Sequence, residues 1–241
     1  MADQRVEAEE PSQTFRRSYS TRFEGTEEPI SEGGMWINGK AQGIDWADVV
    51  TEGGLAHGGR TRMAVAERRA EQGNLDPSSA DAATPVGDYD DPTAVLTGRW
   101  GRNQHARGRV FSRNQTAEYF QEVELRLRSS IAPHSCTGYE VFWRCLKSDE
   151  AYAEIVRWNG PAGAFTSLAR RQGPECGVQD GDIVEAVIEG SHIRSFINGV
   201  EVLSATDDAY ADGSPGIGFN FGCGDTYVDH GFTSYEVDTY D

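Results

Sequence analysis

Apolar and polar residues alternate with a period of two along much of the chain. In "AEYFQEVELRLRSS", residues 117–130, one set of alternate positions holds Tyr119, Gln121, Val123, Leu125 and Leu127. The other set holds Phe120, Glu122, Glu124, Arg126 and Arg128. Successive side chains of a strand point to opposite faces, so this pattern predicts a half-buried strand with one polar, solvated face.

Similar segments follow at a spacing of roughly 10 to 15 residues, with Gly, Asn, Asp or Pro between them. They are "TGYEVFWRC", "AYAEIVRW", "AFTSLARR", "DIVEAVIEG", "HIRSFING", "VEVLSATD", "GIGFNFG" and "HGFTSYEVDTY". No amphipathic helical pattern separates these segments. Short strands in such a series predict an all-β fold, with two antiparallel sheets packed as a sandwich or jelly roll.

Two segments lack this pattern. Residues 1–22 are polar and predict an extended arm, which would lie against its own domain or a neighbouring subunit. Residues 58–92 predict an insertion between strands, with a short helix over Met63–Gln72 followed by a loop. The remaining chain, 23–241, is expected to form one sandwich domain, since a sandwich of this size is commonly a single domain.

Charge and composition restrict the partners. The net charge of −17 would repel nucleic acid and anionic membrane surfaces. No apolar run is long enough to span a bilayer, and the charged N-terminus lacks the apolar stretch of a secretory signal. The chain would therefore stay where it is made or leave by another route, such as inside an assembling particle; we expect an extracellular or virion-surface location.

Four cysteines leave two interpretations open, buried thiols or disulfides. They are Cys136, Cys145, Cys176 and Cys223, and their spacing fits no zinc pattern. Cys136 and Cys145 would lie too far apart on one extended strand to bond to each other.

The run "GDIVEAVIEGSHIRSFINGVEVLSATDDAYADGSPGIGF", residues 181–219, resembles the C-terminal part of the concanavalin A-like lectin/glucanase superfamily, including laminin G-like domains. The closing "HGFTSYEVDTY" is similar to the last strand of those domains, which returns beside the first. Asn198 and Gly199 tolerate the positive φ of tight hairpin turns, so these letters follow from the scaffold. The resemblance implies the fold but not the activity, because lectins, hydrolases, lyases and adhesion modules share it.

Two enzymatic interpretations are open. Retaining hydrolases of this superfamily place acids at alternate positions of one strand; Glu122 and Glu124 fit, but the next position is Arg126. A polysaccharide lyase needs a group that neutralises a uronate and residues that move protons. The candidate catalytic residues for this chemistry are Glu140, Arg144, Arg157, Tyr152 and His105.

Calcium is the candidate cofactor, because carboxylate oxygens suit it and acidic residues cluster in two predicted loops. The candidate ligands are Asp88, Asp90, Asp91, Asp207, Asp208 and Asp212. Neither cluster matches an EF-hand loop, and acidic turns are common in so acidic a chain, so the principal expectation is a protein without a cofactor.

Sugar binding requires aromatic faces and planar polar groups. Trp46 and Trp100 lie in polar surroundings and are expected to be exposed. With Glu140, Arg144 and Arg157 they form the predicted ligand-binding set. The sequence favours a non-catalytic carbohydrate-binding or adhesion module, as a surface component of a particle such as a virion. The alternatives are a lyase or hydrolase acting on the polar sheet face, and a purely structural particle protein.

Overall fold

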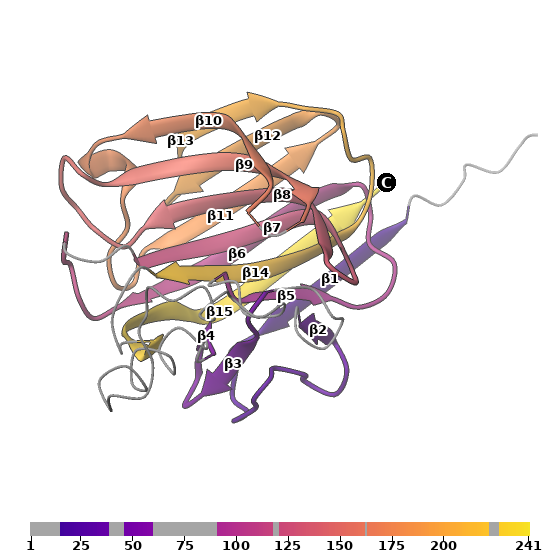
Figure 1. The fold of residues 1–241 in the computed structure, drawn as a ribbon, viewed down its shortest axis with the longest axis horizontal. Coiled ribbons are helices and arrows are strands. Elements are labelled where there is room, and N and C mark those ends of the chain that lie inside the picture. The colour runs from indigo at the N-terminus through magenta and orange to yellow at the C-terminus, as the bar shows by residue number, and fades with distance from the viewer. Residues whose placement is uncertain (1–14, 39–45, 60–90, 118–120, 162, 222–226) are drawn as a thin grey trace, which may run out of the picture.

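The chain folds into two antiparallel sheets packed face to face (Figure 1). The computed structural model describes residues 15–38, 46–59, 91–117, 121–161, 163–221 and 227–241. The predicted all-β sandwich is confirmed. Within the described ranges, the helical segments are two single 3-10 turns, η3 (Pro174–Cys176) and η4 (Tyr227–Asp229), and no helix is long and apolar enough to cross a membrane.

The eight-stranded sheet has the order β13-β12-β11-β6-β15-β4-β3, and β1 also pairs with β15. Its strands are β1 (Arg16–Thr21), β3 (Val49–Glu52), β4 (Leu55–Gly58), β6 (Asn103–Ser112), β11 (Ile183–Glu189), β12 (His192–Ile197), β13 (Val200–Thr206) and β15 (His230–Tyr240). The last strand lies beside the first, as the sequence predicted.

The seven-stranded sheet has the order β10-β9-β8-β7-β14-β5-β2. Its strands are β2 (Trp36–Asn38), β5 (Thr93–Leu96), β7 (Gln121–Ala132), β8 (Ser135–Arg144), β9 (Tyr152–Gly160), β10 (Phe165–Gln172) and β14 (Ser214–Phe221). The consecutive strands β7 to β10 form a meander, and β14 closes its other side.

Apolar side chains of both sheets fill the space between them. Val123, Leu125 and Leu127 of β7 are buried there with Ala106 and Val110 of β6. Burial of one large apolar side chain contributes about 1.5–3 kcal/mol, so this layer is the main source of stability.

The opposite face of β7 is also buried. The alternation predicted Glu122, Glu124 and Arg126 on a solvated face, but all three are buried. A second apolar cluster of Trp46, Cys136, Val156 and Trp158, with Ile131 and Phe142 packed against it, lies outside the main core. The expectation of a solvated Glu/Arg face was therefore wrong.

The hairpins at 181–206 agree with the sequence. β11 and β12 are joined at Gly190 and Ser191, and β12 and β13 at Asn198 and Gly199, whose φ angles are 51° and 77°. The Asn198 amide Nδ2 also donates to Asp182 Oδ1 at 2.9 Å. This Asn–Asp bond fixes the turn against the start of β11, so both residues serve the scaffold.

The N-terminal segment predicted as an arm joins the sandwich at its C-terminal end. Residues 16–21 form β1 and pair with β15 of the same chain, from Arg16 opposite Tyr240 to Thr21 opposite Tyr235. Because these residues pair within their own chain, they no longer support an arm that binds a neighbouring subunit. Residues 1–14 lie outside the described residues, as do most of the 58–92 insertion and its predicted helix.

Three of the four cysteines are described, and each is a buried free thiol: Cys136, Cys145 and Cys176. Cys223 lies outside the described residues. Of the two interpretations left open by the sequence, the thiol form holds for these three.

Candidate functional site

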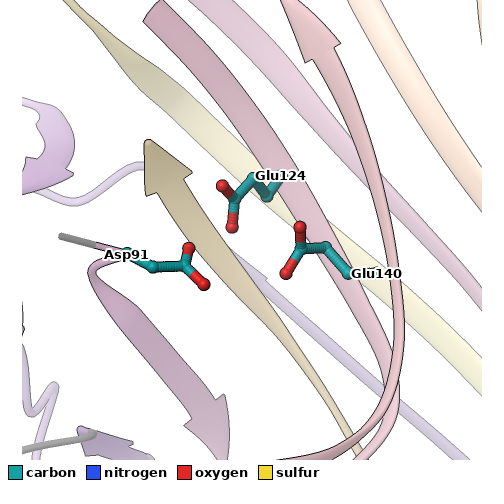
Figure 2. A group of neighbouring side chains, drawn as sticks. All are labelled: Asp91, Glu124 and Glu140. Carbon is teal, nitrogen blue, oxygen red and sulfur yellow. The ribbon is translucent and has the colours of Figure 1, made fainter. Parts of the chain in front are cut away.

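Three carboxyl groups and one guanidinium meet on the outer face of the seven-stranded sheet. We call Asp91, Glu124, Arg126 and Glu140 the carboxylate–arginine cluster; Figure 2 shows its three acidic side chains pointing toward one another. Arg126 Nη2 lies 3.1 Å from Asp91 Oδ2, 3.2 Å from Glu124 Oε2 and 2.7 Å from Glu140 Oε2. One nitrogen therefore contacts all three carboxyl groups.

Strand register brings these residues together. Glu124 and Arg126 occupy alternate positions of β7, and Glu140 of β8 lies directly opposite Arg126. Gly218 of β14 lies opposite Glu124 on the other side. A Cβ at Gly218 would lie 2.2 Å from Glu124 Oε2, so any other residue here would require that carboxyl group to shift.

Two indole groups complete the cluster. Trp158 Nε1 donates to Glu140 Oε2 at 2.7 Å, and Trp46 Nε1 donates to Asp91 Oδ2 at 3.1 Å. The guanidinium carbon of Arg126 lies 5.6 Å from the centre of the Trp158 ring. The Arg126 side chain is 0% exposed, so the cluster is closed to water.

Burial changes the acidity of the cluster. Desolvation raises the pKa of Glu140 to about 8, although Arg126 acts in the opposite direction. Desolvation, together with the charges of Asp91 and Glu140, raises the pKa of Glu124 well above its usual range. Three carboxylates against one guanidinium leave excess negative charge in a low-dielectric site, and protons offset part of it.

The acidic groups of the cluster lie close together, but they are already engaged by Arg126 and the two indoles. A retaining hydrolase needs two carboxyl groups about 5–5.5 Å apart that both reach the sugar. Here Arg126 lies among the carboxyl groups, and the buried Trp46 donates a hydrogen bond to Asp91. The arrangement can hold charge and protons in place, but a sugar could reach these acids only after Arg126 and Trp46 had moved.

A metal ion faces the same obstacle. Asp91, Glu124 and Glu140 each offer an oxygen, and these oxygens lie within 4.8 Å of one another, which suits a hard cation such as Ca²⁺. Arg126 Nη2 already occupies the position between them. The residues therefore do not fit a metal while Arg126 keeps this conformation.

A second polar group lies farther along the same face. The Tyr152 hydroxyl donates to Glu122 Oε1, and Asn220 Nδ2 donates to Glu122 Oε2 at 2.9 Å. Arg144 lies 5.6 Å from the centre of the Tyr152 ring and donates to the carbonyl oxygens of Glu150 and Ala117, each at 3.1 Å. Desolvation raises the pKa of Glu122, while the bonds from Tyr152 and Asn220 lower it.

The structure does not assemble the predicted lyase set. Tyr152 and Arg144 meet each other but bond to Glu122 and to backbone, and Glu140 belongs to the cluster. Arg157 pairs in register with the buried Tyr139, on the inter-sheet side, and its Nη1 lies 2.6 Å from Asp207 Oδ2. His105 is on β6 of the other sheet, with Nε2 2.8 Å from Glu185 Oε2. The five candidate residues of a lyase are therefore not brought together in one site.

The two tryptophans expected at the surface are buried. Trp46 is 0% exposed and Trp100 is 4% exposed. Trp100 carries the guanidinium of Arg17 over its ring at 3.9 Å, and its Nε1 donates to Thr97 O at 3.1 Å. Both indoles are buried in spite of their polar sequence neighbours, so the prediction of exposure was wrong.

The calcium candidates divide into three groups. Asp88 and Asp90 lie outside the described residues, and Asp91 is held in the cluster. Asp207 is held by Arg157, by the Tyr139 hydroxyl at 2.7 Å and by the Ala209 amide at 2.9 Å. Among the described residues, Asp207, Asp208 and Asp212 do not form a three-ligand group. Calcium binding by exposed Asp208 or Asp212 stays a prediction.

Comparison with known proteins identifies the fold. No protein-family model and no curated protein sequence matches the chain. A carbohydrate-binding module from Bacillus subtilis is 12% identical, with a TM-score of 0.51, over 88% of this chain and 96% of the other. An endo-β-1,3-glucanase from Pyrococcus furiosus is 12% identical, with a TM-score of 0.52, over 92% and 94%.

A third similar structure comes from work on endo-acting O-glycanases of the human gut microbiota, with 8% identity, a TM-score of 0.51 and coverage of 92% and 99%. The expected concanavalin A-like sandwich is thus confirmed as the fold. Proteins with this fold include a carbohydrate-binding module and glycan-cleaving enzymes, so fold alone leaves the activity open.

Proposed function

We propose that this protein is a carbohydrate-binding module that does not cleave its ligand. The observation that carries the proposal is the position of Arg126, whose Nη2 contacts the three carboxyl groups of the carboxylate–arginine cluster. An acid or base must reach the substrate proton to act on it. Acids held by a buried guanidinium are positioned for stability instead.

The carbohydrate part of the proposal rests on the fold and on surface chemistry. The chain has the fold of a carbohydrate-binding module over most of both lengths. Its charge of −17 disfavours acidic polymers, so neutral glycans are the better candidates. The particle role expected from the arm is not part of the proposal, because β1 pairs within its own sandwich.

The test is a binding screen that also detects cleavage. The protein is run in affinity gels containing neutral polysaccharides (laminarin, lichenan, levan, galactan) or acidic ones (alginate, polygalacturonate). Reducing ends and the ultraviolet absorbance of unsaturated sugars are measured in parallel incubations. We expect retardation by at least one neutral polysaccharide and no new reducing ends or unsaturated products.

Glu124→Gln and Glu140→Gln separate the interpretations, because both substitutions keep the shape of the side chain. Both variants should bind as the wild type does. If the wild type forms products and either substitution abolishes them, the protein is an enzyme and the proposal is overturned. The proposal is also overturned if the wild type binds none of the polymers.

A further inference from the structure

The outer face of the eight-stranded sheet is open and polar. Along β6, His105, Arg107 and Arg109 point outward and are exposed, while Ala106 and Val110 are buried on the other side. The Arg107 side chain is 46% exposed, whereas Arg126 on the other sheet is fully buried. The two sheets thus use similar residues in different environments.

One row of side chains runs across this face, perpendicular to the strands. In register, Phe196 of β12 lies opposite Glu185 of β11, Glu185 opposite Arg107, and Arg107 opposite Glu236 of β15. Glu185 Oε2 lies 2.8 Å from His105 Nε2 and 3.3 Å from Arg107 Nη2. Cross-strand pairs therefore hold these planar polar groups before any ligand arrives.

A second network lies beside the row, farther along β11 and β15. The Tyr240 hydroxyl donates to Glu189 Oε1 at 2.7 Å, and Arg194 Nη2 lies 2.6 Å from Glu189 Oε2. The Arg194 guanidinium lies 5.6 Å from the centre of the Phe196 ring. Tyr240 is one of the few large apolar side chains exposed among the described residues. This network combines an aromatic surface with fixed polar groups.

Three adjoining depressions, which share lining residues, lie on either side of the row. The first, of about 330 Å³, is bordered by His105, Arg194 and Tyr240, and it shares Glu185 and Gly199 with the second, of about 430 Å³. The second shares Arg109, Ser234 and Glu236 with the third, of about 670 Å³, which ends at β1. We call this the cross-strand groove. It passes over β12, β11, β6, β15 and β1, and four strand spacings give a length of about 19 Å.

The groove is locally neutral. Its charged lining consists of four arginines (Arg22, Arg107, Arg109, Arg194) and four glutamates (Glu24, Glu185, Glu189, Glu236). The whole chain, in contrast, carries −17. A balanced groove offers donors and acceptors together without a net attraction for ions.

We propose that the cross-strand groove binds a neutral oligosaccharide chain, laid across the strands of the eight-stranded sheet. The assignment rests on the proposed carbohydrate-binding function and names its site. Sugar hydroxyls donate and accept at once, which suits adjacent Arg and Glu side chains, and the Tyr240 ring offers a surface for a sugar ring. The groove is a series of open depressions that adjoin one another across five strands, which favours an extended chain over a single enclosed sugar.

The test compares two arginines that differ in sheet but not in exposure. Arg107→Ala removes the centre of the groove. Arg170→Ala is the matched control, because Arg170 is 49% exposed and is also paired with a glutamate, Glu154, on the other sheet. Binding to the neutral polysaccharide retained in the screen is measured by isothermal titration for both variants and for Tyr240→Ala, with thermal unfolding as the check on folding.

Arg107→Ala and Tyr240→Ala should each weaken binding about tenfold or more, and Arg170→Ala should not change it. Wild-type affinity should change less than about twofold between about 0.05 and 0.5 M NaCl, because a neutral ligand is not attracted by charge. Binding that survives Arg107→Ala and Tyr240→Ala would refute the groove while leaving the proposed function intact. A wild type that binds no polysaccharide would overturn both.

Discussion

Replacing Arg126 with methionine tests whether the carboxylate–arginine cluster is held by its one cation. The substitution keeps much of the side-chain volume but removes the group that contacts Asp91, Glu124 and Glu140 at 2.7–3.2 Å. Removing one partner of a buried ion pair costs about 3–5 kcal/mol. Since three carboxyl groups lose their partner at once, we expect at least this loss of unfolding free energy above pH 8.

The loss should depend on pH. The unfolded-state pKa of a glutamate is near 4.5, and burial raises that of Glu140 to about 8 even with Arg126 present. A carboxyl group whose pKa is raised on folding costs stability as pH rises through this range, because the native state keeps a proton that the unfolded state loses. Without Arg126 the native pKa values of the carboxyl groups rise further. Near pH 5 the carboxyl groups are neutral and lack only a hydrogen-bond partner, so the loss of unfolding free energy caused by the substitution should shrink to about 1–3 kcal/mol.

Urea unfolding followed by tryptophan fluorescence at about pH 5 and about pH 8.5 measures both losses. Arg170→Met is the control, and an exposed pair of this kind should contribute at most about 1 kcal/mol at either pH. If the variant is unfolded above pH 8, it should refold on acidification. Equal losses at the two pH values would refute the explanation that uncompensated carboxylates cause the instability.

Three further predictions concern the buried acids and the buried thiols. Glu140→Gln should flatten the fall of unfolding free energy between about pH 4.5 and pH 8, measured by the same urea titrations, because it removes the ionisation whose pKa is about 8. Arg126→Ala, unlike the wild type, should gain thermal stability from calcium in a melting experiment, since three carboxylate oxygens within 4.8 Å would then lack a cation. Cys136, Cys145 and Cys176 should resist alkylation in the native protein but react after denaturation, as peptide mass spectrometry can show, because all three are buried and burial raises the pKa of Cys136 to about 11.

The strands and turns could be predicted because their signals are local. Alternation at Val123, Leu125 and Leu127 depends only on which face meets the core, and the Asn198-Gly199 turn needs only residues that accept positive φ. Both signals are carried by a few adjacent letters. They can therefore be recognised in a short segment, without knowing how the remainder of the chain folds.

The cluster could not be predicted in the same way, because its partners are distant in sequence. Asp91 reaches Arg126 across 35 positions, and Trp46 reaches Asp91 across 45. Alternating charge normally indicates a solvated face, and nothing near Glu124 or Arg126 shows that the face is covered. One signal was present: β7 and β8 carry complementary charges, with Glu122 opposite Arg144 and Arg126 opposite Glu140.

Burial, rather than residue type, separates the two faces of this sandwich. Both sheets set Glu against Arg in neighbouring strands, Arg126 with Glu140 on one and Arg107 with Glu185 on the other. A sugar that bonded to the first pair would have to break contacts made in a dry site, where their loss costs several kcal/mol. At the second pair it would replace water, because Arg107 is half exposed. The same Glu/Arg alternation therefore supports the scaffold on the seven-stranded sheet and leaves the eight-stranded sheet available for a ligand.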